Sequence, residues 1–345
     1  MGFPRSATVL FLLAGLAVSL SAPGVALAGS DYSDKSFGLR LPPAFVRFRD
    51  VSTSGGQTVA NRYSSAINPA ATDWTEVPSK FGVVLAPYFS AAMFRAGTQL
   101  YLTGEAVNWD TRTCGTVQPT LAQINSNQVA NRQGIEFEYD VDIFQLQWGK
   151  RWGDWAFGMN FNYADAMVTQ HAGGMLLSRG RGDSWRFRFG GLWEPIERWL
   201  FGAAFEYGFA PSESTVWMPT EFGIVQVKDT GTHHQYILRQ GVSYEYGDMS
   251  SVYLDYQFAV YADGGDRLES HRWNLGAEHR LLQWLFLRGD VAMDSRGNPG
   301  LSAGVGMHLG ECCTIDVGYH YDIYPELNRE FGRSNTLQFT FSFRF

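Results

Sequence analysis

The sequence contains little cysteine and no excess of basic residues, and each shortage excludes a class of protein. Three of the 345 residues are cysteine, which excludes a disulfide-rich scaffold. Lysine and arginine number 27 against 34 aspartate and glutamate residues, and the formal net charge is -7. Such a balance leaves no basic footprint for nucleic acid, so we expect no nucleic-acid partner.

Long apolar runs are also scarce. The mean hydropathy of -0.17 excludes a bundle of membrane helices. One apolar run, from Val9 to Leu20, follows Arg5 and precedes Ala26-Leu27-Ala28. A basic start, a short apolar run and a small-x-small site are typical of a secretory signal peptide, and the run is shorter than the roughly 20 residues of a membrane helix. We therefore predict a cleaved signal peptide over residues 1–28.

Aromatic residues and glycine are plentiful instead. Aromatic residues make up 15% of the chain, which also has 38 glycines. Both values exceed the usage of an ordinary soluble domain of this size. Aromatic girdles and tight turns of a transmembrane β-barrel account for this composition.

The C-terminal residues alternate without a defect. Odd positions from Leu337 to Phe345 are apolar, mostly phenylalanine, and even positions from Gln338 to Arg344 are polar. A period of two indicates a strand with one apolar and one polar face, as in the closing strand of a transmembrane barrel. The terminal Phe345 resembles the assembly signal of bacterial outer-membrane proteins. This resemblance implies an outer-membrane location, lipid contact and recognition by the barrel-assembly machinery.

Segments of similar length and alternation recur from residue 81 to the C-terminus. We identify thirteen, although a single-chain bacterial barrel normally has an even number. Either one strand is miscounted or one is missed, and the candidates for a missed strand are 219–229, 110–133 and 44–52. Long connections at 110–133, 167–182, 211–233 and 325–334 are interpreted as external loops. The predicted fold is all-β, a transmembrane antiparallel barrel of 12 to 14 strands over residues 81–345, monomeric, with no metal site and no cofactor.

Charged residues alternate along several predicted strands. Because a charge facing lipid costs roughly 2–4 kcal/mol near the midplane, we expect these side chains to face the lumen. A salt-bridged, water-filled interior is the simplest explanation of their presence. They are Glu136, Glu138, Asp140, Asp142, Arg186, Arg188, Arg272, Arg288 and Asp290.

In the segment from Ile135 to Trp148, the alternation of apolar and polar residues shifts by one position. Apolar residues occupy odd positions from Ile135 to Ile143 and even positions from Phe144 to Trp148. A phase change within a strand predicts a β-bulge at Ile143-Phe144. Such a bulge is either a rim irregularity or a gap through which an apolar ligand leaves sideways.

The segment before the barrel, residues 29–80, alternates poorly and contains Asn68-Pro69-Ala70. This motif, placed after a signal peptide and shortly before Phe81-Gly82-Val83, resembles the FadL-type family of outer-membrane transporters. The resemblance implies a fourteen-stranded barrel plugged by an N-terminal hatch, and passive uptake of long-chain fatty acids or aromatic hydrocarbons. The family's kinked third strand is similar to the phase change at Ile143-Phe144.

The expected function is therefore a plugged channel for hydrophobic small molecules. Apolar residues of a long connection, Val216, Trp217, Met218 and Phe222, are candidates for ligand capture, with packing on the rim as the alternative. A general porin is a second hypothesis, although a long N-terminal plug argues against it. A barrel enzyme such as a lipase or protease is a third, but no serine lies in a recognisable nucleophile context.

The cysteines leave one question open. Cys114 pairs with Cys312, with Cys313 or with neither. The loop count places Cys114 and the Cys312-Cys313 pair at opposite ends of the barrel, which argues against a bond.

Overall fold

The computed structural model describes residues 58–62, 68–73, 80–90, 95–105, 109–110, 115–130, 135–220, 223–248, 250–263, 266–310, 313–321 and 334–344. The predicted signal peptide, Phe345, Cys114 and Cys312 lie outside these residues, so their predictions remain untested. No helix among the described residues is long and apolar enough to span a membrane.

Strands dominate the described residues, and the all-β, antiparallel prediction is confirmed. The elements are η2 (Pro69–Asp73), β1 (Lys80–Ser90), β2 (Arg95–Glu105), β3 (Trp109–Asp110), β4 (Thr116–Ala130), β5 (Ile135–Trp152), β6 (Trp155–Ala172), β7 (Met175–Ile196), β8 (Trp199–Thr220), β9 (Gly223–Gly247), β10 (Ser250–Asp263), β11 (Asp266–Leu282), β12 (Leu285–Asp294), β13 (Pro299–Leu309), β14 (Cys313–Tyr321) and β15 (Ser334–Arg344). Among these residues, fourteen strands have nine or more residues, and β3 has two.

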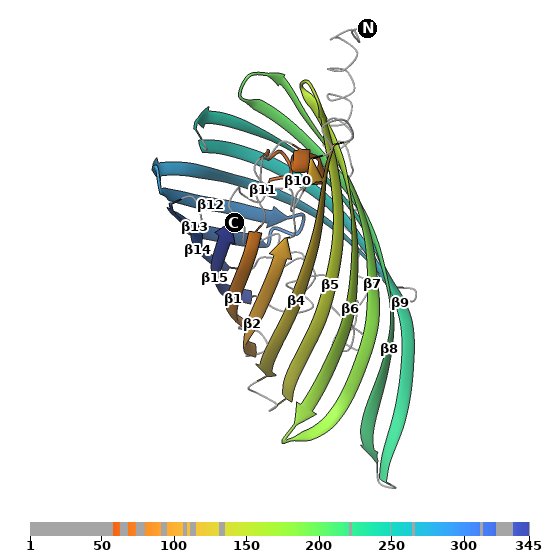
Figure 1. Cartoon of the computed structure of the whole chain (residues 1–345). Helices are drawn as coiled ribbons and strands as arrows, with labels where there is room; N and C mark the ends of the chain where they lie inside the picture. Colours follow the sequence, from red (N-terminus) through yellow and green to blue (C-terminus); the bar gives the residue numbers. More distant parts are fainter. Residues whose placement is uncertain are drawn as a thin grey trace. The chain divides into compact units, whose positions relative to one another are not determined.

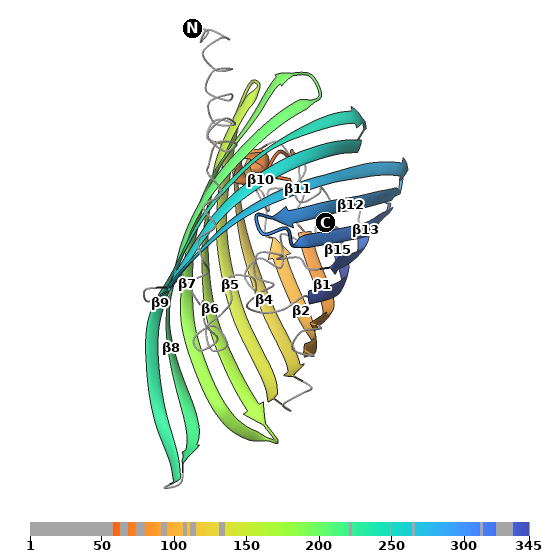
Figure 2. The same ribbon diagram turned by 180° about the vertical axis from the view of Figure 1, so that it is seen from behind.

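All strands belong to one antiparallel sheet. Consecutive strands pair from β4 to β15, β15 pairs with β1, and β1 pairs with β2. The ladder also joins β2 to β4 through eleven residue pairs, from Arg95↔Ala130 to Glu105↔Thr120. Figures 1 and 2 show the strands in this order from opposite sides. Two-residue turns at 153–154, 197–198 and 283–284 lie at one end of the strands, which we call the proximal end.

The two faces of the sheet differ in chemistry. We call the face that contacts residues 58–62 and 68–73 the inner face. On β6 the inner side chains, such as Asn160 and Ala164, are buried, whereas Phe157 and Met159 on the outer face are each 48% exposed. The alternation read from the sequence therefore corresponds to a real difference between the two faces.

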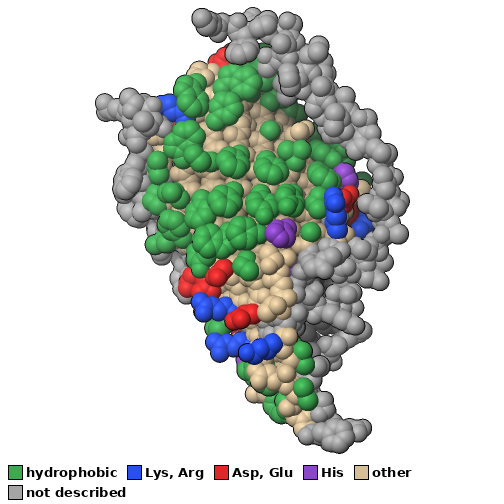
Figure 3. Space-filling view, turned by 90° about the vertical axis from the view of Figure 1, so that its right-hand side faces the viewer, with side chains coloured by type: hydrophobic (Ala, Val, Ile, Leu, Met, Phe, Trp, Pro, Cys, Tyr) green, Lys and Arg blue, Asp and Glu red, His purple; other side chains and the backbone are tan. Residues whose placement is uncertain are grey.

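An apolar band covers the outer face of β5 to β9, and a row of charges marks its border (Figure 3). The last apolar row contains Phe144, Tyr163 and Trp185, which pair across three strands. The next row contains three aspartates. Asp142 pairs with Asp165, and Asp165 pairs with Asp183.

Like charges in register repel one another, and neighbouring side chains relieve this repulsion. Arg181 forms an ion pair with Asp165 at 3.0 Å, and the Tyr163 hydroxyl donates to Asp183 at 2.9 Å. The border is therefore a hydrogen-bonded interface between an apolar and a polar zone.

Two of the sequence predictions about strand number and loops are resolved by the strand bounds. The strand missing from the initial thirteen is β4, which lies within 110–133. The connections 167–182 and 211–233 were expected to be loops, which is wrong. They form the distal parts of β6 to β9, with a tight turn at Gly173-Gly174 between β6 and β7. The candidate strand at 44–52 lies outside the described residues.

The predicted β-bulge at Ile143-Phe144 is wrong. Ile143 pairs with Ala122 and Ala164, Phe144 pairs with Leu121 and Tyr163, and neither ladder shifts register there. The change in sequence pattern has another cause. On passing the border of the band, the outer side chains of β5 change from apolar Phe144 to charged Asp142, and the inner side chains from Gln147 to Ile143.

The same geometry corrects part of the predicted set of inward charges. Glu138, Asp140 and Asp142 are exposed on the outer face, so the expectation that they face inward is wrong. They lie beyond the apolar band, where an outward charge meets water and carries little penalty. Glu136 lies among residues whose side chains the structure does not describe.

A charge placed on the outer face of β6 tests the extent of the apolar band. Met159→Arg should lower the free energy of unfolding in lipid vesicles by about 2–4 kcal/mol, because it places a guanidinium within the hydrocarbon. Thr169→Arg is the matched control on the same face, beyond the border and in register with Glu138. Denaturant titration of both variants measures the difference, and equal losses would contradict the assigned band.

Candidate functional site: the seat of the N-terminal segment

Two stretches of the N-terminal region, residues 58–62 and 68–73, lie on the inner face of the sheet. We call them together the N-terminal segment. Val59, Asn68, Ala70 and Ala71 are each 0% exposed. The element η2 contacts β4, β5, β6 and β7. The sequence motif Asn68-Pro69-Ala70 is therefore buried at the centre of a contact with the sheet.

Asn68 connects the two stretches of the segment to the sheet. Its Nδ2 donates to the carbonyl oxygens of Val59 at 2.9 Å and Gly191 at 3.0 Å, and lies 3.4 Å from that of Ala203. Its Oδ1 accepts from the Ala70 amide at 3.1 Å. A side-chain amide has both donors and an acceptor, so asparagine satisfies groups of opposite polarity at one buried point.

Pro69 and its neighbours explain the local shape. Asn68 has the N-cap role, because its side-chain oxygen accepts from the second residue after the cap. Proline suits the first helical position, where an amide hydrogen would have no intrahelical partner. Within the turn, the Thr72 hydroxyl donates to the Pro69 carbonyl at 2.7 Å. The result is a compact 3₁₀ turn, Pro69–Asp73, small enough to lie against the sheet.

Glycines from five consecutive strands form the surface under this segment, and we call them the glycine seat. Gly149 pairs with Gly158, and Gly158 with Gly190. A second row lies two residues further along the strands, where Gly202 pairs with Gly241. Strand glycines often mark a place where another backbone approaches closely.

A methyl group at any seat position would collide with a neighbour. At Gly158 a Cβ would meet the carbonyl of Pro69, and at Gly202 it would meet the carbonyl of Val59. At Gly190 it would lie 2.8 Å from Cδ of Pro69. The segment therefore contacts the sheet backbone directly, and the glycines are required by this contact rather than by backbone conformation.

Asp255 on β10 continues the Gly202–Gly241 row and binds the first stretch. Its Oδ1 accepts from the Thr58 hydroxyl at 2.7 Å, and its Oδ2 accepts from the Val59 amide at 2.8 Å. The carboxylate is 3% exposed. One buried carboxyl group thus binds both a side chain and a backbone amide of the first stretch, so Asp255 is a principal anchor.

The second stretch is anchored at its C-terminal end. Asp73 accepts from the Thr116 hydroxyl at 2.6 Å and from the Arg151 amide at 2.7 Å. Thr72 accepts from Gln147, which in turn accepts from Asn160 at 2.9 Å. Polar side chains of β4, β5 and β6 thus hold the turn at the proximal end of the sheet.

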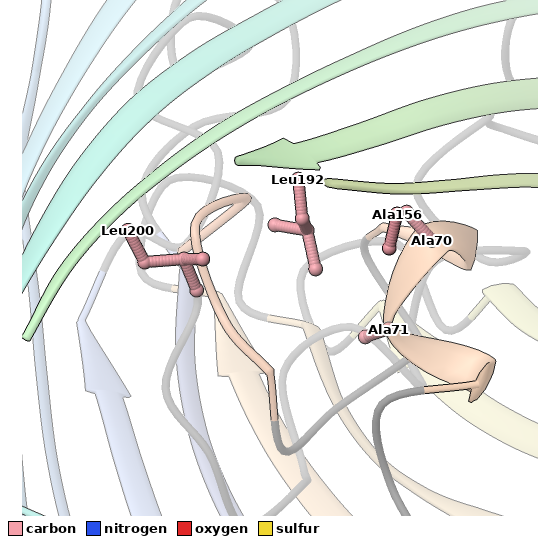
Figure 4. Close-up of a cluster of buried hydrophobic side chains, with 5 residues drawn as sticks. All are labelled: Ala70, Ala71, Ala156, Leu192 and Leu200. Carbon is pink, nitrogen blue, oxygen red and sulfur yellow. The ribbon is translucent and has the colours of Figure 1, made fainter. Parts of the chain in front are cut away.

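Apolar contact in the seat is modest. A buried cluster contains Ala70, Ala71, Ala156, Leu192 and Leu200 (Figure 4). The segment contributes only the two alanines to this cluster, and Val59 packs on Ala204 in a second one. An alanine methyl buries little apolar area, so hydrogen bonds and ion pairs supply a large share of the attachment.

Ionic side chains fill other parts of the inner face. Arg188 pairs with Glu206 at 2.5 Å, and Arg186 lies 3.7 Å from the same carboxylate. Arg288 pairs with Asp316 at 2.6 Å and with Glu278 at 3.4 Å. The strand register places Arg272 and Asp290 on this face as well. These residues join neighbouring strands to one another.

Sequence reasoning missed the glycine seat and Asp255. The sequence signal for both was a glycine or aspartate on the inner face of a strand, next to a similar position on the neighbouring strand. Reading it required the register of every hairpin, which alternation alone does not provide.

The predicted capture residues occupy a strand rather than a loop. Val216 and Trp217 are half-buried in β8, where Val216 pairs with Val227 of β9. The side chain of Met218 and the whole of Phe222 lie outside the described residues. Beside them, Ile224, Val225 and Val227 are exposed, with 71% exposure at Ile224. The sequence analysis did not single these three residues out as capture candidates.

Among the described residues, no group of three His, Cys, Asp or Glu side chains is arranged to hold a metal ion. Cys313 begins β14 opposite Leu309, and Cys114 is not described, so the question of a bond between them stays open.

No model of a known protein family and no curated protein sequence matches this chain. Solved structures do match it. The toluene transporter TbuX of Ralstonia pickettii superposes with a TM-score of 0.55 at 13% identity, over 86% of this chain and 98% of that one. The CymD monoaromatic hydrocarbon channel gives 0.52 at 12% identity, over 81% and 91%. The deltaS2S3 mutant of the TodX monoaromatic hydrocarbon channel gives 0.52 at 10% identity, over 86% and 98%.

These similarities establish the fold. The chain is structurally similar, over most of its length, to channels of hydrophobic compounds, and the resemblance inferred from the sequence is confirmed at this level. At 10% to 13% identity, this similarity does not assign a role to any individual residue of this chain.

A pair of adjacent glycines tests the seat. Gly190→Ala should displace the segment and destabilise its contact by about 1–3 kcal/mol, because the added methyl overlaps Asn68 and Pro69. Gly191→Ala is the control, since its Cβ would meet Phe157 at an ordinary 3.7 Å. Hydrogen–deuterium exchange of residues 68–73 should accelerate in the first variant alone, and equal exchange in both would contradict the seat.

The amide of Asn68 can be tested at constant size. Asn68→Asp replaces the donor by a carboxylate that faces carbonyl oxygens, whereas Asn68→Ala only removes hydrogen bonds worth about 0.5–1.5 kcal/mol each. We expect faster exchange of the segment in both variants, and the larger increase in Asn68→Asp. An aspartate variant that exchanges like the unmodified protein would show that these hydrogen bonds do not hold the segment.

Proposed function

We propose that this protein is an outer-membrane channel for passive uptake of hydrophobic small molecules, and that its N-terminal segment plugs the barrel. The observation that carries the proposal is the glycine seat. Five strands carry glycine where the segment lies, which is expected for a wall that receives a plug.

Closure of the sheet into a barrel is part of this proposal. The β2–β4 ladder supports it, because it gives the two ends of the strand order a common pairing. A closed sheet leaves no edge in lipid, where an unpaired backbone group costs several kcal/mol. The apolar outer band supports a position across the membrane, with the proximal turns at the periplasmic side.

A barrel of about fourteen strands is wider than one layer of inward side chains can fill. Something must therefore occupy the interior if the membrane is to remain tight. The buried Asn68 turn supports the assignment of residues 29–80 as this hatch and of residues 81–345 as the barrel. The same turn argues against the general porin, whose interior stays open.

On the distal side of the seat, the inner face carries apolar instead of polar side chains. Val141 pairs with Ala166, and Ile143 pairs with Ala164, and all four side chains are buried. At the tip of the β8–β9 hairpin, Ile224 and Val227 are suited to capture ligand together with the half-buried Val216 and Trp217. Aromatic hydrocarbons and long-chain fatty acids are the substrate classes that match these surfaces and the fold.

Uptake and conductance together test the proposal. Cells of a Gram-negative host that make this protein should take up radiolabelled toluene or oleate faster than cells with an empty vector. The purified protein should be nearly silent in a planar bilayer, and Asn68→Asp should open it. A large steady current from the unmodified protein would support a porin instead, and unchanged uptake of both probes would overturn the transport function.

A further inference from the structure

Arg62 joins the N-terminal segment to two strands at the proximal end of the sheet. Its Nη2 lies 2.9 Å from Oε1 of Glu194, and its Nε lies 2.8 Å from Oε1 of Glu245. Glu194 is near the end of β7 and Glu245 near the end of β9, so one guanidinium spans the intervening strand β8. Because the guanidinium is a planar group with several donors, it suits two carboxylates at once.

The backbone of both glutamates is fixed at the proximal end of the sheet. The Glu194 amide donates to the Asp154 carbonyl at 2.9 Å, and the Glu245 amide donates to the Arg198 carbonyl at 2.8 Å. These backbone bonds fix each glutamate to a proximal turn. The two glutamate side chains therefore extend from backbone positions that belong to the sheet itself.

The apolar part of the remaining contact is small. At the glycine seat the sheet presents backbone to the segment. The apolar contribution comes from small residues, Ala70, Ala71 and Val59. A segment held in this way can leave without repacking the wall once its polar contacts break.

Water reaches the ion pairs of Arg62 with Glu194 and Glu245. The side chain of Arg62 is 17% exposed and those of Glu194 and Glu245 are each 18% exposed. Attraction between such charges is screened by salt more strongly than attraction between deeply buried ones. The strength of these ion pairs should therefore depend on ionic strength on the proximal side.

We propose that Arg62, Glu194 and Glu245 form an ionic clasp that positions the plug and sets how often it opens. This inference rests on the proposed function, since it takes the N-terminal segment as the plug. Arg62 is a positioning residue in this scheme. Loss of its charge frees the proximal part of the segment, while Asn68 and Asp255 still bind the remainder.

The test compares Arg62→Gln with Arg280→Gln. Arg280 forms an ion pair with Asp248 at the same end but joins strands of the sheet to one another. In a planar bilayer, Arg62→Gln should open about three- to tenfold more often than the unmodified protein, and Arg280→Gln should not. Raising salt from about 50 to 500 mM should increase opening of the unmodified protein and leave Arg62→Gln unchanged.

Two further variants keep the outcome decisive. If Arg62→Gln does not fold, Glu194→Gln combined with Glu245→Gln removes the same pairs from the other side. The charge exchange Arg62→Glu with Glu194→Arg and Glu245→Arg should restore low opening and its salt dependence. Opening that is unchanged in Arg62→Gln but raised in Asn68→Asp would overturn the clasp and leave the plug intact. Opening that is unchanged in both would overturn the plug itself.

Discussion

The contact between the N-terminal segment and the glycine seat is the constraint on which the rest of the structure depends. A turn of ordinary backbone reaches the inner face only where the strands carry no Cβ. That requirement places glycine at Gly149, Gly158, Gly190 and Gly202, and glycine at Gly241 leaves room for the Asp255 carboxyl group that binds the segment. Asn68 completes the contact, because its amide satisfies carbonyl groups of the segment and the sheet together. A larger residue on either side would separate the two surfaces.

The strength of this contact suits a part that moves. Deep hydrogen bonds to Asp255 and Asn68 define where the segment lies, and small apolar residues add little area. A segment held by a large apolar surface would be hard to displace. Water and ions can compete with attachment through polar groups, as the proposed plug requires.

Much of the fold could be predicted from the sequence because a strand has a fixed period. The alternation in β6 and in the C-terminal strand indicated an antiparallel sheet with one apolar face. The prediction failed where surroundings change along one strand. At Ile143-Phe144 the apolar phase switches because β5 leaves the apolar band, and the backbone stays regular. For the same reason Glu138, Asp140 and Asp142 face outward, beyond the border of the apolar band.

The site was harder to predict than the fold. Asn68-Pro69-Ala70 was recognisable as a local motif, because three consecutive residues determine a turn. The glycine seat was not, since its members are separated by 9, 32, 12 and 39 residues along the chain. That they form one surface can be recognised only when the register of four hairpins is known. The similarity to hydrocarbon channels supports the fold, while the seat and its anchors are properties of this chain.

A reversible cross-link tests most directly whether the seated segment closes the channel. Ala70 and Ala156 belong to one buried cluster, so cysteines at these two positions, with the native cysteines replaced by serine, should form a disulfide when the segment is seated (Figure 4). Uptake of labelled toluene or oleate should stop when the disulfide forms and return when it is reduced. Uptake that continues at the same rate in the cross-linked protein would contradict the account.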